Sequence, residues 1–255
     1  MHVEQVLVLL AAALAAGWVD AMVGGGGLIQ FPALLLATPG QPVVTALATN
    51  KLGSIMGVSS AAVVYARKAK PDLPVALSAG GLAVGCAAAG ALCAAAISSA
   101  ALTPVIMVVL LATAALVVLK PDLGRAPRLV LRTRRRVAAA VLVPGVLIAF
   151  YDGLVGPGTG TFLVVAFTAL LGMDFVNAAA TAKIINAGTN LGALAVFAVQ
   201  GHVLWAIGLA MGACNIAGAQ LGARMAINRG AGFVRVVLLC VVCAMVVKLG
   251  LQRFG

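Results

Sequence analysis

Charged residues are scarce in this sequence. Asp, Glu, Lys and Arg make up 9% of its 255 residues, against roughly a quarter in an ordinary soluble domain, and 63% of the residues are hydrophobic. This composition excludes a water-soluble globule. It also excludes intrinsic disorder, because so apolar a chain would collapse. The 17 basic and 6 acidic side chains are too few for a separate extramembrane domain, so residues 1–255 are predicted to form one all-α polytopic membrane domain.

Acidic residues are the scarcer of the two charged classes, and the net charge is +11. Much of the excess lies in residues 120–136, which contain seven cations and one acid, Asp122. Short loops rich in Lys and Arg stay in the cytoplasm. No aromatic residue interrupts this run and no nucleic-acid motif accompanies it. We therefore predict a basic cytoplasmic connector here, in contact with the bilayer surface, and no nucleic-acid partner.

Residues for common enzyme chemistry are also missing. The two histidines, His2 and His202, fall at the N-terminus and in a predicted loop, and no Cys/His spacing matches a zinc or haem site. There is no Ser/His arrangement for a hydrolase and no GKS or GKT ending for a phosphate-binding loop. We expect no enzyme, no nucleotide-driven pump, no metal and no cofactor. The five cysteines lie in apolar stretches and are interpreted as core residues.

An internal repeat organises what is present. The sequence contains ten apolar runs, and the last five repeat the spacing of the first five. A constant offset of 132 residues places Asp20 on Asp152 and Lys51 on Lys183. Residues that this offset superimposes are called equivalent. Matched charges are informative because so few occur. The repeat divides the chain into a first half, residues 1–120, and a second half, residues 137–255, joined by the connector at 120–136.

The cations indicate how the halves are oriented. In the first half they follow the third apolar run, at residues 67–70, whereas in the second half they follow the fourth, at Arg224 and Arg229. If basic loops are cytoplasmic, the halves are inverted-topology repeats with both chain termini outside. Lys248 and Arg253 fit this arrangement less well. A parallel arrangement is the alternative.

An inverted arrangement needs an odd number of membrane crossings in each half. The second apolar run is too short to span: residues 28–37 would form about 15 Å of helix, half the hydrocarbon core. We therefore predict that the first hairpin of each half is broken at glycines, with a half-helix or re-entrant arm. Non-helical backbone at that depth lines a cavity or is buried in protein.

Glycine-rich breaks follow Asp20 and Asp152. Glycine permits positive φ and close approach of the backbone to a ligand, and successive N–H groups that lead into a helix N-terminus form an anion site. The alternative is that these glycines only allow tight helix packing. Two breaks at matched positions, each beside an aspartate, favour the anion site. Its predicted residues are Gly24, Gly25, Gly26, Gly27, Gly156, Gly158, Thr159 and Gly160.

Lys51 and Lys183 lie well inside apolar runs. A charge at mid-bilayer costs roughly 2.5–3.5 kcal/mol, so each lysine is predicted to face the protein interior or water. The alternative is that they snorkel to an interface. Hydrogen-bonding residues near both lysines complete a predicted substrate-binding lining that consists of Thr49, Asn50, Lys51, Ser54, Thr181, Lys183, Asn186 and Asn190.

Asp20 and Asp152 are the expected neutralising partners of the lysines. An anion that engages the lysine would remove the charge that keeps the carboxylate ionised, so the carboxylate would take up a proton. We therefore predict that the two aspartates couple anion binding to proton binding. The alternative is that they are permanent struts, which means structural ion pairs with the lysines that never open, or that they cap the broken helices.

These motifs resemble a known family. The pattern GWVDAMVGGGGL with ATNKL, followed by DGLVGPGTGTF with AATAKIIN, is similar to the TauE/SafE family of sulfite and sulfonate exporters, also called the toluene-sulfonate uptake permease family, and to its YfcA-like branch. The resemblance covers essentially the whole sequence. It implies a bacterial inner-membrane transporter of sulfur-containing anions, for which hydropathy usually assigns about eight helices, here built from ten helical segments. The connector at residues 120–136 matches no motif of the family.

The leading interpretation is a secondary transporter of a small sulfur-containing oxyanion, with two lysines and two half-helix N-termini as its charge complement. The alternatives are an anion channel, which would need a continuous polar pore, and a transporter of another small organic anion such as a carboxylate. The expected partners are the anion and the lipid bilayer. The sequence leaves open a homodimer, the exact substrate, the direction of transport and the coupling ion.

Overall fold

The computed structural model describes residues 3–119 and 132–254, with side chains described for residues 3–113 and 132–229. Residues 120–131 of the connector, and the side chains of Lys248 and Arg253, therefore lie outside the described part. Every regular element within the described part is helical. The predicted all-α fold is confirmed.

Five helices form the first half, and local sequence features explain two of their boundaries. The glycines at 24–26 separate the first two helices, and the Asp72 side chain caps the fourth by accepting a hydrogen bond from the backbone of Val75. The helices are α1 (Val3–Val23), α2 (Gly27–Ala37), α3 (Val43–Lys68), α4 (Leu73–Ala96) and α5 (Ser99–Leu119).

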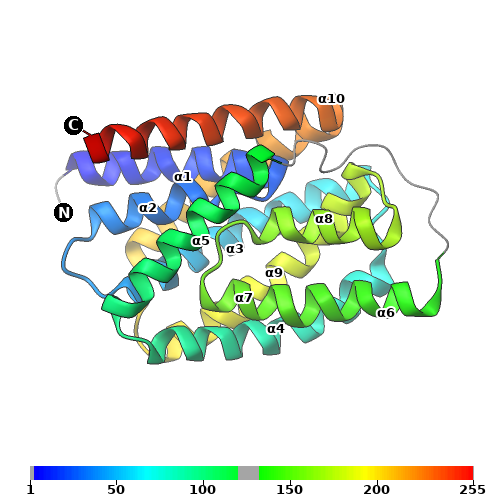
Figure 1. The fold of residues 1–255 in the computed structure, drawn as a ribbon, viewed down its shortest axis with the longest axis horizontal. Coiled ribbons are helices and arrows are strands. Elements are labelled where there is room, and N and C mark those ends of the chain that lie inside the picture. Colours follow the sequence, from blue (N-terminus) through cyan, green and yellow to red (C-terminus); the bar gives the residue numbers. More distant parts are fainter. Residues whose placement is uncertain (1–2, 120–131, 255) are drawn as a thin grey trace.

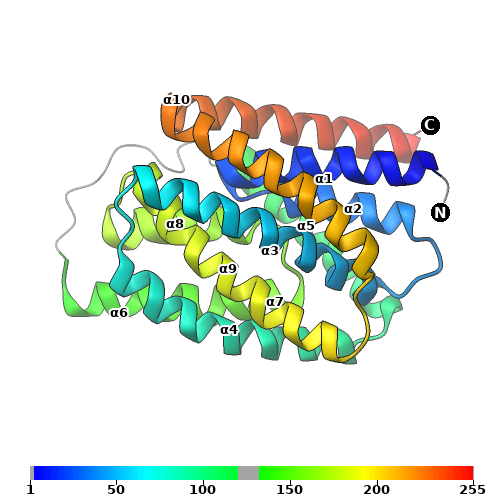
Figure 2. The same ribbon diagram turned by 180° about the vertical axis from the view of Figure 1, so that it is seen from behind.

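The second half begins with one continuous helical segment in which a π-helical stretch, η1, contains Pro144 and Gly145. Its elements are α6 (Arg134–Leu142), η1 (Val143–Ile148), α7 (Ala149–Leu154), α8 (Thr159–Leu171), α9 (Phe175–Val199) and α10 (Trp205–Phe254). The sequence predicts separate segments at 203–226 and 231–250; both are helical and belong to the single element α10, which turns back on itself between them (Figure 1 and Figure 2). No proline lies between them to interrupt the backbone hydrogen bonds, so α10 includes both.

Five helices of the described part are long and apolar enough to cross a membrane: Val3–Val23, Leu73–Ala96, Arg134–Leu154, Phe175–Val199 and Trp205–Arg229. The 26 residues of α3 are also long enough, at about 39 Å, but its buried polar residues lower its mean hydropathy. By contrast, α2 has 11 residues and α8 has 13, so they extend for about 17 and 20 Å, less than the hydrocarbon core. The predicted half-helices are present.

The two broken hairpins approach from opposite ends of the molecule. In Figure 1, α1 and α2 form a hairpin that enters from the left, and the hairpin of α6, α7 and α8 enters from the right. Their glycine breaks meet inside the protein, where a Cβ on Gly24 would lie 2.2 Å from the carbonyl carbon of Gly160. Side chains at this crossing would prevent the contact, so the sequence needs glycine there.

The two halves pack reciprocally, through equivalent positions of the repeat. A Cβ on Gly90 in α4 would lie 2.1 Å from the carbonyl oxygen of Phe150, and one on the equivalent Gly222 in α10 would lie 2.2 Å from that of Trp18. The first segment of each half thus packs closely on the fourth helix of the other half. Each of these contacts between the halves is matched by the other through equivalent residues, which is the pattern of an interface with two-fold symmetry.

Cations gather at one end of the molecule. The connection between α3 and α4, the start of α6 and the turn within α10 lie at the right end in Figure 1 and the left end in Figure 2. An ion pair between Asp72 and Arg132 fixes the start of α4 beside the residues that precede α6. These segments carry Arg67, Lys68, Lys70, Arg132, Arg134, Arg135, Arg136, Arg224 and Arg229.

Candidate functional site

Two buried lysines, the buried Asp152 and the partly buried Asp20 form two ion pairs that are exchanged between the halves. The Lys51 ammonium on α3 lies 2.8 Å from Oδ2 of Asp152 on α7, and it donates to the Asp152 carbonyl oxygen at 2.6 Å. The Lys183 ammonium on α9 lies 2.7 Å from Oδ2 of Asp20 on α1, and it also donates to the Asp20 carbonyl oxygen. Pairing between lysine and aspartate was predicted, but the sequence does not say which half supplies each partner.

Both lysines face the protein interior. Lys51 is 2% exposed and Lys183 is 3% exposed, so the alternative in which they snorkel to an interface is wrong. Asp152 is buried to the same degree, at 2% exposed. A buried charge needs a partner and further hydrogen bonds to offset its desolvation, and each lysine here receives both from one aspartate.

The aspartates also hold the glycine breaks in shape. The backbone N–H of Gly26 donates to Oδ1 of Asp20 at 3.3 Å, and the Thr159 hydroxyl donates to Oδ1 of Asp152 at 2.6 Å. Only Asp20 accepts from a backbone N–H at the start of a broken helix, whereas Asp152 accepts from a side-chain hydroxyl, so neither α2 nor α8 has a side-chain cap at its first turn. One consequence is that a backbone donor expected to face a bound anion already contacts a carboxylate of the protein.

Three glycines of the breaks have the backbone conformation that was predicted. Gly24, Gly156 and Gly158 have φ of +82°, +93° and +87°, which L-amino acids rarely adopt. For Gly26 the expectation of a positive φ is wrong, because its φ is −57°, as in an ordinary helix. It is glycine for another reason: a Cβ there would lie 2.6 Å from the carbonyl oxygen of Ala16.

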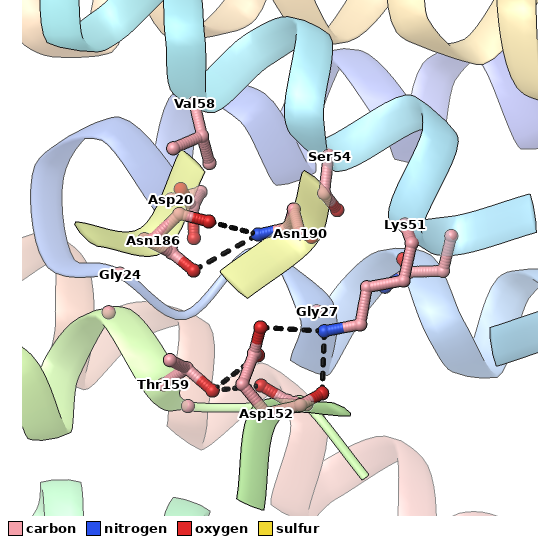
Figure 3. A pocket seen from close by; sticks show the side chains of 14 residues that line it. Asp20, Gly24, Gly27, Lys51, Ser54, Val58, Asp152, Thr159, Asn186 and Asn190 are labelled. Atoms are coloured by element: carbon pink, nitrogen blue, oxygen red, sulfur yellow. Dashed lines mark hydrogen bonds and ion pairs between the residues drawn. The ribbon is translucent and has the colours of Figure 1, made fainter. Parts of the chain in front are cut away.

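A small pocket lies where the breaks meet the ion pairs. Figure 3 shows Lys51 extending from α3 toward Asp152, with Thr159 below and Asn186 and Asn190 opposite. Thirteen of the predicted site residues line it: Asp20, Gly24, Gly27, Asn50, Lys51, Ser54, Asp152, Gly156, Gly158, Thr159, Gly160, Asn186 and Asn190.

The pocket draws on equivalent positions of both halves. Ser54 is equivalent to Asn186, Val58 is equivalent to Asn190, and all four line it. Val58 was not predicted, because it is apolar and its only signal is its equivalence to Asn190. The pocket encloses about 20 Å³, which is room for about one water molecule. A larger anion therefore requires the lining residues to move apart.

Five predicted residues lie away from the pocket, among them Lys183. The Thr49 hydroxyl accepts a hydrogen bond from the backbone N–H of Leu204, and the Thr181 hydroxyl accepts one from that of Asp72. These two bonds are again equivalent, since the repeat places Thr49 on Thr181 and Asp72 on Leu204. The remaining two residues are Gly25 and Gly26.

Sequence reasoning missed a buried amide pair next to the first hairpin. The Asn215 side chain on α10 donates to Oε1 of Gln30 on α2 at 2.7 Å, and both residues are buried. It attaches the short helix α2 to the long helix α10. A signal was available, since polar amides are unusual in apolar helices and face other protein segments there. Among the described residues, no group of His, Cys, Asp and Glu could hold a metal ion.

One protein family and several known proteins match the chain along most of its length. The family described as "Sulfite exporter TauE/SafE" matches residues 9–249. The chain is 39% identical to "Probable membrane transporter protein ORF9" of Sinorhizobium over 94% of this chain and 90% of that protein. It is 33% identical to "Probable membrane transporter protein YfcA" of Escherichia coli K12, over 97% and 90%. A "Probable membrane transporter protein" of Haemophilus influenzae is also 33% identical, over 91% and 89%. No solved structure matches the chain.

Apolar spans around a buried polar site, together with these relatives, define a membrane transporter. The chain belongs to the TauE/SafE family, as the resemblance of its motifs indicated.

Proposed function

We propose that this protein is a secondary transporter of small sulfur-containing oxyanions across the bacterial inner membrane, coupled to protons. The observation that carries the proposal is the pair of ion pairs exchanged between the halves, at the point where two glycine breaks meet in apolar surroundings. Lysine, backbone N–H groups and amide side chains are the donors that a compact group of anionic oxygens requires. The family's description as sulfite exporters supports sulfur as the central atom.

The charge balance of the site supports proton coupling. Two lysines and two aspartates sum to zero, so a bound monovalent anion adds an uncompensated negative charge in apolar surroundings, where charges interact strongly. A proton on one carboxylate restores neutrality. An anion and a proton would then move together, and no separate proton pathway is needed.

We also infer that the halves are inverted repeats and that the cationic end of the molecule is cytoplasmic. The hairpins enter from opposite ends and the contacts between the halves are reciprocal, which supports the first point (Figure 1). Nine described cations lie at one end, which supports the second by the positive-inside rule. The alternating exposure of a central site follows from such repeats.

Two alternatives differ from this proposal. The protein could be an anion channel instead of a transporter, or its substrate could be a carboxylate instead of a sulfur oxyanion. Asn50, Lys51, Ser54, Asn186 and Asn190 gather at the small pocket beside the breaks, which favours a transporter with one site. For the substrate, the deciding experiment is a thermal-shift panel of the purified protein with sulfite, sulfate, thiosulfate, taurine, sulfoacetate and carboxylates. Ligands that bind the folded state raise its melting temperature.

We expect sulfur oxyanions to raise the melting temperature and carboxylates to leave it unchanged. Stabilisation by carboxylates alone would contradict the substrate, and no stabilisation by any anion would contradict the site. Proteoliposomes then separate the transport modes, because a transporter gives saturable anion flux that a pH gradient drives, whereas a channel gives flux that follows the anion gradient and ignores the pH gradient.

A further inference from the structure

We infer that the two ion pairs have different tasks: Lys51 leaves Asp152 to bind the anion, whereas Lys183 and Asp20 stay together as a strut. This inference rests on the proposed function and goes further. A repeat with matched charges predicts that both ion pairs do the same thing, whereas we assign them different roles. The substrate contact is assigned to one lysine and the proton to one aspartate.

The first observation is which groups the pocket reaches. Lys51 lines the pocket and Lys183 does not. Asp20 lines it as well, so an anion that approaches the second pair meets the carboxylate of Asp20 and is repelled. An anion that approaches the first pair meets the Lys51 ammonium beside the Asp152 carboxylate, which also lines the pocket, so this pair offers a cationic partner that the second pair does not (Figure 3).

The second observation is how each carboxylate is held. Both oxygens of Asp20 accept hydrogen bonds, Oδ1 from the Gly26 N–H and Oδ2 from the Lys183 ammonium. For Asp152, Oδ1 accepts from the hydroxyl of Thr159, and the buried Oδ2 faces the Lys51 ammonium at 2.8 Å. If Lys51 turns away, Oδ2 loses this partner and a proton can replace it.

The third observation is an unfilled acceptor beside Lys51. Asn50 is 7% exposed and lines the pocket, and its Oδ1 is buried without a hydrogen-bond partner. Buried polar atoms are almost always paired, so this oxygen needs a donor, such as a water molecule that enters with the anion, because an oxyanion offers only acceptor oxygens. The equivalent position in the second half is Ala182, which has no polar group. The unfilled polar capacity therefore lies on the side of Lys51.

The charges around Asp152 identify Lys51 as the group whose movement changes its ionisation. The helices α4 and α8 and the π-helix η1 pack against α7 and contain no charged residue. On α9, Lys183 is held by Asp20, which faces Asp152 across the pocket. When Lys51 binds the anion, a proton from the bulk solution forms an O–H bond with Oδ2 of Asp152. One negative and one positive charge have then entered the site, and its net charge is unchanged.

The repeat supplies matched controls for the test. We would use full-length protein in detergent and methanesulfonate as the probe, because its charge is constant between about pH 5 and 8. The variants are two charge-neutral doubles, Lys51→Met with Asp152→Asn and Lys183→Met with Asp20→Asn. We expect the first double to lose the methanesulfonate-induced thermal shift, and the second to melt at a lower temperature and keep at least half of that shift.

A single variant and the second double test the proton. Asp152→Asn should flatten the dependence of methanesulfonate affinity on pH, and the double Lys183→Met with Asp20→Asn should still show a dependence on pH. Equal loss of binding in both doubles, or a flat pH profile in the double Lys183→Met with Asp20→Asn, would overturn the inference while leaving the transporter proposal intact. A wild-type protein that no anion stabilises would overturn both.

A second measurement avoids variants of the strut, which can fail to fold. Infrared difference spectra of the wild type should show a carboxylic acid band when methanesulfonate is added, and Asp152→Asn should abolish it. If the band persists in Asp152→Asn, the proton is on another group and the inference is wrong.

Discussion

Lys51 of the first half pairs with Asp152 of the second half, and not with Asp20, the aspartate of its own half. The equivalent exchange joins Lys183 to Asp20. Neither half can therefore neutralise its buried charges alone. The site exists only where the two halves meet, which is also where both glycine breaks cross.

The exchanged pairs predict how stability responds to their removal. Lys183→Met alone leaves the partly buried carboxylate of Asp20 without its partner. Breaking a fully buried pair costs about 3–5 kcal/mol in other proteins, and the 16% exposure of the Asp20 side chain lowers this cost. We expect a clearly lower melting temperature in detergent, and partial recovery when Asp20→Asn is added. Arg132→Ala is the control, because that arginine is exposed and its pair with Asp72 should contribute no more than about 1 kcal/mol. Equal losses in Lys183→Met and Arg132→Ala would contradict a buried strut.

Substitution of two glycines with the same backbone conformation distinguishes the effect of backbone strain from the effect of close packing. Gly24 and Gly40 have φ of +82° and +81°, but a Cβ on Gly24 would overlap Gly160, whereas one on Gly40 meets nothing within 4 Å. Alanine at either position costs about 1–2 kcal/mol of backbone strain. Gly24→Ala should in addition abolish anion-induced stabilisation, since the breaks can no longer cross. If both variants behave like the wild type in the anion titration, the crossing is not needed for binding.

The buried amide pair should behave as a coupled unit. Asn215→Ala removes the donor to Gln30 and leaves a buried amide unsatisfied, which costs about 1–3 kcal/mol. Gln30→Met should cost a similar amount. In a double-mutant cycle the losses should be less than additive, because the second change removes the group that the first left unpaired. Strict additivity in chemical or thermal unfolding would show that α2 and α10 are joined by packing alone.

Much of the helix arrangement could be predicted from the sequence, because apolar runs of this length form helices wherever lipid or protein surrounds them. The half-helix α2 and the buried position of Lys51 followed from run length and desolvation cost. The partner of Lys51 could not be predicted, since the repeat spacing does not say which hairpin lies beside which helix. Val58 was missed because its place in the pocket depends on the fold, and Gly26 was misinterpreted because close packing and positive φ both select glycine.

Membrane topology provides the last prediction. In a cysteine-free background, we would introduce single cysteines at four exposed positions: Lys68→Cys and Asn228→Cys at the cationic end, and Gly40→Cys and Gln200→Cys in the loops α2–α3 and α9–α10. A membrane-impermeant thiol reagent added to intact cells should label the second pair only, and the first pair should react after the cells are permeabilised. The physical reason is that Lys and Arg resist translocation, so the cationic end stays in the cytoplasm. Labelling of Lys68→Cys and Asn228→Cys from opposite sides would exclude inverted repeats and favour the parallel arrangement.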